Sequence, residues 1–408
     1  MLSIGKLTAG RADYYVEQLP TGRDEYYLRS ERDEAASWLG AAAGHLGLEG
    51  EVTPEAFRLM LDARHPVTGE PLGVPHTTAR RVAGFDLCFS APKSVSVLWA
   101  LGGPELAAAV VSAHDRAVAA AVETLEAEAV RARRGAGGLR MEETGGVAAA
   151  GFAHRSSRAG DPQIHTHVVV ANLTPDRDGR WSSLYGARIY RWAKTVGYTY
   201  QAELRAHLSR ELGVTWTPIR NGMADIDGMP EPVCQAFSAR RAQIQNALDQ
   251  VGASSASAAQ TATLATRAAK ATVADLVTLR EDWRNRAAQL GLAPDFTTGL
   301  LGRSQPSSPD LATTASRLLG PEGLTHHASS FDRRDLIQAL VTASQNGSPA
   351  REARAGADRV LADPDVVTLG RQDPAGRRYT TRELLAVEAR LIERAQTRLG
   401  TTVRTATP

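Results

Sequence analysis

Two histidines one residue apart, in the stretch DPQIHTHVVVANL at residues 161–173, have the type and spacing of metal ligands. His165 and His167 lie in a run rich in β-branched residues, which favours a strand. Alternate side chains of a strand point to the same face, so the pair offers two imidazole nitrogens to one ion. A usable metal site needs at least one further ligand.

His154 is the candidate for the third ligand. Strands are predicted at about 146–155 and 163–173, joined by the turn SSRAGDP. If the turn is centred near residues 159–160, His154 lies opposite His165, although a slip of one residue would put it on the other face. Three neutral imidazoles with an open coordination position are typical of a site that binds substrate, and the retained charge of the ion suits an anion such as phosphate.

An H-x-H pair in a strand also occurs with no metal role. A closed structural zinc site is a further alternative, but it needs a fourth protein ligand, commonly cysteine. The two cysteines, Cys88 and Cys234, are not near the histidines in sequence and have no metal-type spacing. Cys88 is interpreted as a small buried residue of its strand.

Four of the nine tyrosines lie in DYYVEQLPTGRDEYY near the N-terminus: Tyr14, Tyr15, Tyr26 and Tyr27. Adjacent aromatic residues usually serve core packing, so the pairs alone are weak evidence. A phenol with a pKa of ~10 can act as a nucleophile if a nearby divalent cation favours its ionised form. Attack of a tyrosine on a phosphodiester keeps the bond energy in a phosphotyrosine linkage, so the cut strand can be rejoined.

The elements that must position these residues mix strands and helices without strict βαβ alternation, which favours an α+β domain with a mainly antiparallel sheet. A strand is predicted at the N-terminus, and GFDLCFSAPKSVSVLWAL reads as strand, proline bend and strand. The clearest helix runs from Pro104 to Arg134. Other helices are predicted at 35–46, 192–212, 232–251, 273–290, 333–343 and 381–398, with a small hairpin at VVTLGRQDPAGRRYTT.

The composition limits the number of domains, the kind of partner and the cellular compartment. The 408 residues, of which 43% are hydrophobic, suffice for two or three domains. A net charge of only +2 means that any nucleic-acid partner must meet a local basic surface. Two cysteines, no apolar run of membrane-spanning length and no secretory signal predict a cytoplasmic protein.

Taken together, the tyrosine pairs, FDLCFSAPKSVS at 85–96 and FAHRSSRAGDPQIHTHVVVANLT at 152–174 resemble the MobF-type conjugative relaxases, also called the TrwC/TraI type, which are HUH endonucleases. The resemblance implies a central five-stranded antiparallel sheet flanked by helices, with a helical region that folds over bound DNA. It also implies nicking and rejoining of single-stranded DNA at an origin of transfer, through a covalent 5′-phosphotyrosine, and passage of the protein to the recipient cell.

The resemblance also implies roles for single residues. Tyr14 matches the first nucleophile and Tyr26 the second, with Tyr15 and Tyr27 as neighbours that could exchange roles. Asp86 matches an acidic residue that orients a metal histidine or accepts the tyrosine proton; its alternative is a strand-end carboxylate held by local hydrogen bonds. The metal triad is His154, His165 and His167. The candidate DNA contacts, for each of which plain surface exposure is the alternative, are Lys93, Lys194, Arg80, Arg81, Arg155 and Arg158.

The expected cofactor is a divalent metal ion. Members of the family are usually assumed to work with Mg or Mn, whereas three imidazoles suit Zn, Ni, Co or Cu. The expected partners are single-stranded and origin-of-transfer DNA, and by resemblance accessory relaxosome proteins and a type IV secretion coupling protein.

The resemblance gives the chain three parts. Residues 1–295 form the relaxase domain, residues 296–330 are a linker rich in Ser, Thr, Gly and Pro, and residues 331–408 are a mainly helical segment that resembles the start of a helicase module. The chain has no G-x-x-x-x-G-K-[ST] phosphate loop, so it is predicted to be the N-terminal portion of a longer protein.

Three other functions stay open on the sequence alone. A rolling-circle replication initiator shares the histidine core and the tyrosine chemistry. A metal-stabilised DNA-binding module would use the same histidines without catalysis. A metallohydrolase would attack the phosphate with water and leave no covalent adduct.

Overall fold

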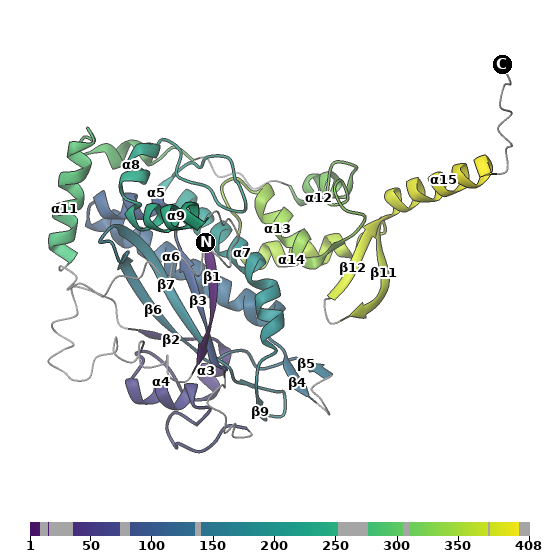
Figure 1. Ribbon diagram of the computed structural model, residues 1–408, viewed down its shortest axis with the longest axis horizontal. Coiled ribbons are helices and arrows are strands. Elements are labelled where there is room, and N and C mark those ends of the chain that lie inside the picture. The colour runs from purple at the N-terminus through teal and green to yellow at the C-terminus, as the bar shows by residue number, and fades with distance from the viewer. Residues whose placement is uncertain are drawn as a thin grey trace.

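The computed structural model describes residues 1–8, 15, 36–73, 82–134, 140–251, 276–304, 310–373 and 376–399. Its centre is a five-stranded sheet with the order β1-β3-β7-β6-β2, in which every neighbouring pair is antiparallel (Figure 1). The strands are β1 (Leu2–Thr8), β2 (Ser37–Leu39), β3 (Val82–Ser90), β6 (Ala149–Ser156) and β7 (Pro162–Ala171). The predicted α+β class with a five-stranded antiparallel sheet is therefore confirmed.

The hairpin of β6 and β7 has the predicted register. His154 is the partner of His165 in the ladder, and a register shift follows between His154 and Ser156. The turn closes through the Ser157 amide, which donates to the Asp161 carbonyl at 2.8 Å. Gly160 has a φ of +76°, a value that a residue without a side chain adopts at little cost.

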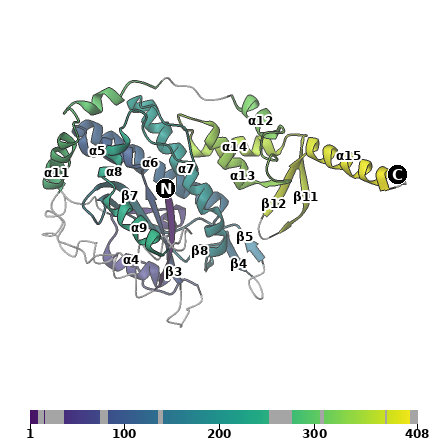
Figure 2. The same cartoon turned by 45° about the horizontal axis from the view of Figure 1, so that its top comes forward.

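Different helices cover the two faces of the sheet. On one face α5 (Lys93–Leu101), α6 (Pro104–Glu128) and α7 (Gly186–Leu212) pack against the buried side chains of Leu87, Ile164 and Val168. On the other face α3 (Ala41–His45) and α4 (Pro54–Leu61) form a smaller core with Val169 and Phe152. Figure 2 shows α6 and α7 running beside each other, away from α4.

Several predicted elements differ from the structure, among them the helix predicted at 232–251, which is divided into Glu231–Ala236 and Ala239–Val251. Residues 93–101 form a helix rather than a second strand, because Pro92 caps its start and nearly all of its side chains are buried, so no helical periodicity is visible. The range 35–46 divides into β2 and α3 at Gly40, which has a φ of +88°. The long helix ends at Glu128, and Ala132–Arg134 form β4, which pairs with β5 (Arg140–Glu142).

A group of helices lies over the tip of the histidine hairpin. The indole of Trp283, in α11 (Leu276–Gln289), donates to the Gly160 carbonyl at 2.8 Å and packs against Trp99 of α5 with ring centroids 5.7 Å apart. The other short elements of this part of the chain are β8 (Thr174–Pro175), β9 (Trp181–Ser182), α8 (Glu231–Ala236), α9 (Ala239–Val251) and the 3-10 helix η3 (Phe296–Leu300).

The rest of the chain forms a small module, which begins with α12 (Leu311–Leu319), inside the range read from the sequence as a linker. A three-stranded sheet has the order β10-β12-β11, and the hairpin of β11 and β12 matches the one expected from the sequence. Its elements are β10 (Phe331–Asp332), α13 (Arg333–Ala343), α14 (Ala350–Leu361), β11 (Val366–Asp373), β12 (Gly376–Thr381) and α15 (Arg382–Leu399).

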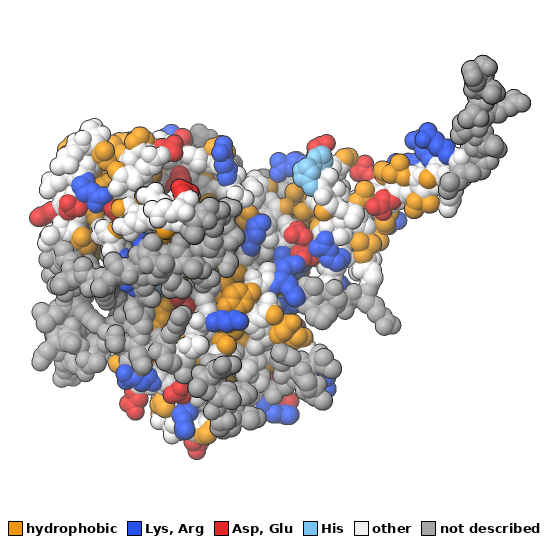
Figure 3. Space-filling model, in the orientation of Figure 1, with side chains coloured by type: hydrophobic (Ala, Val, Ile, Leu, Met, Phe, Trp, Pro, Cys, Tyr) orange, Lys and Arg blue, Asp and Glu red, His pale blue; other side chains and the backbone are white. Residues whose placement is uncertain are grey.

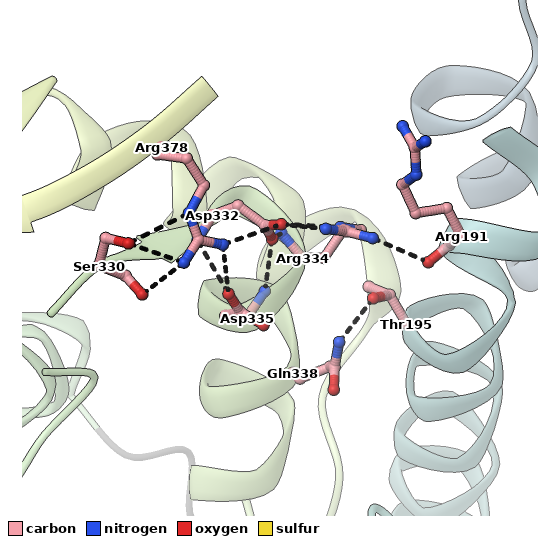
Figure 4. A network of polar contacts seen from close by, with 8 residues as sticks. All are labelled: Arg191, Thr195, Ser330, Asp332, Arg334, Asp335, Gln338 and Arg378. Atoms are coloured by element: carbon pink, nitrogen blue, oxygen red, sulfur yellow. Dashed lines mark hydrogen bonds and ion pairs between the residues drawn. The ribbon is translucent and has the colours of Figure 1, made fainter. Parts of the chain in front are cut away.

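The module packs on α6 and α7 of the main body. Leu336 and Ile337 of α13 belong to the same apolar core as those helices. Figure 4 shows the polar contacts around it: Gln338 donates to the Thr195 hydroxyl at 2.8 Å, and Arg334 donates to the Arg191 carbonyl at 3.2 Å. Beyond this contact α15 projects away from the body (Figure 1). None of the described helices has the length and apolar character needed to cross a membrane.

Candidate metal centre

The three histidines converge on one face of the hairpin. One ligand nitrogen of each of His154, His165 and His167 lies within 4.8 Å of the others, and all three side chains are partly exposed. Their ring centroids are 5.1 to 5.4 Å apart. Among the described residues, this is the one group of His, Cys, Asp or Glu side chains with such spacing.

His165 is held in one orientation by its own strand. Its Nδ1 lies 3.0 Å from the Gln163 carbonyl, so this nitrogen carries the proton and donates, and Nε2 is left for an ion. Burial lowers the pKa of His165 to about 4, and the neighbouring His167 acts in the same direction. The imidazole is therefore neutral at physiological pH, as a metal ligand must be.

His167 is held by a carboxylate instead. Its Nδ1 lies 2.8 Å from Oδ1 of Asp86, which again directs Nε2 toward the other histidines. Burial opposes the charged form, but Cys88 and Asp86 outweigh it and raise the pKa of His167 to about 11. A metal ion bound here must displace a proton, and the carboxylate then makes the imidazole a more basic ligand.

Tyr15 lies behind His167, on the Asp86 side. Its hydroxyl donates to Oδ2 of Asp86 at 2.6 Å and lies 3.4 Å from His167 Nδ1. The side chain is only 4% exposed and packs on Phe152 with ring centroids 5.2 Å apart. Asp86 thus joins a tyrosine to a histidine of the triad. The other predicted tyrosines, Tyr14, Tyr26 and Tyr27, lie outside the described residues.

Cys88 corrects one expectation. It is the ladder partner of His167, it is partly exposed, and its sulfur lies 3.7 Å from the Ser90 hydroxyl. Its thiol lies close enough to raise the pKa of His167, so the interpretation of Cys88 as merely a small buried residue is wrong. The sequence signal was the alternation of β3, which puts positions 86, 88 and 90 on one face.

The hairpin tip is fixed by a residue that the sequence did not single out. The Asp161 carboxylate is buried and accepts from the Ala239 amide at 2.8 Å and from Arg286 at 3.0 Å. Lys93 donates to the neighbouring Pro162 carbonyl at 2.8 Å, and burial lowers its pKa to about 8. Lys93 therefore supports the turn from a partly buried position and is not a freely solvated lysine.

The remaining basic candidates occupy different environments. Arg155 is 6% exposed and points to the face opposite His154, whereas Arg158 and Lys194 are exposed. Arg80 and Arg81 lie outside the described residues. On the face shown in Figure 3, the Lys and Arg side chains that are drawn lie in small groups among acidic ones, as expected for a nearly neutral chain.

The donor set fits a divalent metal ion. Three imidazoles, two with their Nδ1 protons held by an oxygen acceptor, match the ligand type of late transition metals. The partly exposed side of the triad suits substrate or water as the remaining ligands. With an acidic residue and a phenol beside it, the site has the components of a metal-assisted transfer of a phosphoryl group.

Two kinds of known proteins are similar to this chain. Conjugation protein TraI of Escherichia coli, described as multifunctional, is 29% identical over 392 residues, which are 91% of this chain and 21% of that protein. The chain thus spans about a fifth of the length of the curated relatives it matches.

Solved structures of the conjugative relaxase TrwC resemble this fold over 72% of this chain and all of theirs. The metal-free complex with OriT DNA is 32% identical with a TM-score of 0.62, and the copper-bound complex is 34% identical with a TM-score of 0.61. Residues 9–290, well over half of the chain, match the TrwC relaxase family. This match, together with the TrwC-like fold and the histidine triad on the hairpin, shows that the chain belongs to the TrwC relaxase family.

Proposed function

We propose that this chain nicks and rejoins one strand of DNA at an origin of transfer by tyrosine transesterification, as a step of plasmid conjugation. The observation that carries the proposal is the triad of imidazoles joined through Asp86 to Tyr15. The structures of TrwC with OriT DNA support it, one of them with a 27-mer that contains the recognition hairpin and the cleavage site.

The proposed chemistry forms and breaks one bond at phosphorus. The phenol oxygen of Tyr14 attacks the scissile phosphate, the bond to the 3′ oxygen breaks, and that oxygen leaves as a 3′ hydroxyl. The 5′ end stays attached to the tyrosine, and the reverse reaction rejoins the strand. Tyr26 takes the second transfer step, and Tyr27 is its neighbour. Tyr15 serves mainly to hold Asp86, because its hydroxyl is buried on that carboxylate.

His154, His165 and His167 are the proposed ligands of the divalent ion. When bound, such an ion withdraws charge from the non-bridging phosphate oxygens and stabilises the charge that develops in the transition state. Asp86 orients His167, and the Gln163 carbonyl orients His165. Mg or Mn is the proposed working ion, although three imidazoles are the ligand type of Zn, Ni, Co or Cu, and TrwC has been solved with copper.

The wider assignment belongs to the same proposal. Residues 1–295 carry the strand-transfer activity, and residues 331–408 begin a helicase-like module. Single-stranded DNA is the substrate, with accessory relaxosome proteins and a secretion coupling protein as partners. The protein acts in the cytoplasm and enters the recipient with the strand. The likeness to a multifunctional conjugation protein supports these points. The proposed DNA contacts are Lys194 and Arg158, which are exposed, with Lys93, Arg80 and Arg81. Arg155 is buried on the face opposite His154 and is not kept as a direct contact.

The deciding experiment incubates the protein with end-labelled single-stranded oligonucleotides from a candidate origin. We expect a DNA–protein adduct that survives denaturation, requires a divalent ion and disappears in Tyr14→Phe. Tyr379→Phe, in the C-terminal sheet, is the matched control and should form the adduct normally. A free 5′-phosphate product without an adduct would indicate a metallohydrolase. Binding without cleavage would indicate a DNA-binding module.

A further inference from the structure

A series of buried, hydrogen-bonded polar side chains crosses the apolar core on the helix-covered face of the histidine hairpin. His114 of α6 has its Nδ1 2.8 Å from the Tyr200 hydroxyl and its Nε2 2.9 Å from the Thr166 hydroxyl. His114 and Tyr200 are completely buried, and Thr166 is 6% exposed. Replacing hydrogen-bonded polar groups by apolar groups of the same shape can be nearly neutral or even stabilising, so packing alone does not require a polar trio here. The trio therefore calls for a role beyond filling the core.

The trio is fully satisfied without any charge. Burial lowers the pKa of His114 well below its usual value, and it raises the pKa of Tyr200 well above its own. A neutral imidazole donates from one nitrogen and accepts at the other, and a hydroxyl can serve either nitrogen. The two hydrogen bonds therefore form a directed chain from α7 through α6 to β7.

This series of hydrogen bonds ends at Thr166, the residue that lies between two of the triad histidines. Thr166 separates His165 from His167, and the alternation of β7 turns its side chain to the opposite face of the sheet. In the ladder, Thr166 is paired with Phe89 of β3 and with Ala153 of β6. These neighbours hold β7 within the plane of the sheet, whereas the trio holds it from the helix-covered face.

We infer that His114 is a positioning residue for the histidine triad, with Tyr200 as its anchor on α7. By fixing the Thr166 side chain from behind, it sets the rotation of β7 that aims the imidazoles of His165 and His167 at one point. Sites of this kind need their ligands placed to within about 0.5 Å by surrounding contacts. The inference rests on the proposed role of the triad as metal ligands.

The test measures Co²⁺ binding by the metal-stripped full chain, because the visible absorption of Co²⁺ reports ligand geometry as well as affinity. Thr166→Val and Tyr200→Phe each remove one hydroxyl and keep the shape of the side chain. We expect each to weaken Co²⁺ binding by about tenfold, the lower end of the range for groups behind a metal ligand, and to alter the absorption bands. Thr166→Ser keeps the hydroxyl and should bind Co²⁺ normally.

Thr199→Val is the matched control. Thr199 is equally buried and adjacent to Tyr200, but its hydroxyl donates to the Val196 carbonyl within α7. This variant should lose thermal stability, as Thr166→Val does, while Co²⁺ affinity and spectrum stay unchanged. If Thr166→Val and Tyr200→Phe also lower only the melting temperature and bind Co²⁺ like the wild type, the trio is a packing feature and the inference is wrong.

The outcomes separate this inference from the proposed function. A wild-type protein that binds Co²⁺ but forms no adduct with DNA contradicts the proposed function, and the comparison of Co²⁺ affinities still decides the role of His114. A wild-type protein that binds no Co²⁺ contradicts the metal role of the triad and the inference with it.

Discussion

The two faces of the central sheet use the same strands for opposite purposes. Along β3, Asp86 points to the partly exposed metal face, whereas the next residue, Leu87, is completely buried under the helices. Along β7, His167 and Val168 make the same contrast. Because strand side chains alternate, one strand can place chemistry on one face and stability on the other. The difference teaches that neighbouring residues of one strand can serve site and core separately, except where a core side chain such as Thr166 is tied to groups that position the site.

The metal face contains a second contrast, between two ligands of the same strand. His165 faces a backbone carbonyl and has its pKa lowered to about 4, whereas His167 faces a carboxylate and a thiol and has its pKa raised to about 11. Burial opposes the charged form of both side chains, so the difference comes from the groups at Nδ1 and beside the ring. In the absence of metal the pair therefore carries one positive charge, on the doubly protonated imidazole of His167.

The largest expected effect follows from removing a ligand of the metal face. His165→Ala should lower formation of the covalent adduct by more than about a hundredfold, because two imidazoles no longer hold the ion in place. The melting temperature of the metal-free protein should change little, since the side chain is partly exposed. A gel assay of adduct formation checks the first point, and circular dichroism checks the second. Retained activity would exclude the triad as the metal site.

A substitution on the helix-covered face should have the reverse effect, a loss of stability without a loss of metal binding. Leu87→Ala removes a completely buried side chain and should lower the free energy of unfolding by about 2–5 kcal/mol. Co²⁺ affinity measured well below the melting temperature should stay within about twofold of the wild type, because Leu87 takes no part in the hydrogen bonds of Thr166, His114 and Tyr200 that we infer to position the triad. Urea unfolding and Co²⁺ titration provide the two measurements. A proportional loss of both would show that the faces are not separable.

A smaller effect is expected from the residue next to Leu87. Asp86→Asn keeps the size of the side chain but removes the charge that holds His167, and it should weaken metal binding by about tenfold. The pKa of His167 should fall at the same time, since Asp86 is among the groups that raise it. Co²⁺ titration measures the affinity, and NMR titration of the histidine ring measures the pKa. An unchanged pKa would contradict the assigned contact.

The smallest effect is a dependence of stability on pH, with opposite signs at the two histidines. His165 stays neutral in the folded state down to about pH 4, so its contribution to stability falls as the pH drops from 6.5 toward 4. His167 keeps its proton to about pH 11, so its contribution is complete below 6.5 and is lost as the pH rises from 6.5 to 11.

Two variants separate these signs in metal-free protein. Relative to the wild type, the change in the free energy of unfolding caused by His165→Gln should be more favourable at about pH 5 than at about pH 8. The destabilisation caused by His167→Gln should be larger at about pH 5 than at about pH 8. Differences on the order of 1 kcal/mol in urea unfolding are expected. The same sign for both variants would contradict the contrast between the two ligands.

Local sequence patterns predicted much of the hairpin and several helices. The spacing of His165 and His167 and a glycine turn at Gly160 were enough to pair His154 with His165. The helix at 333–343 was also predicted with the observed bounds, and in the structure Asp332 and Asp335 form a capping box at its start. The helix at 93–101 was missed, because a helix buried on all sides shows no periodicity.

The sequence by itself determined the chemistry that the hairpin can offer: imidazoles at strand spacing, a turn that pairs them, and a family resemblance carried by these residues. Only the tertiary structure decided that Asp86 joins Tyr15 to His167, that Cys88 lies beside the same ring, and that His114 contacts Thr166 on the opposite face of the sheet. The physical reason is distance along the chain. Local rules fix contacts within a strand or turn, whereas the partner of a side chain 71 or 81 residues away depends on how the strands are ordered in the sheet.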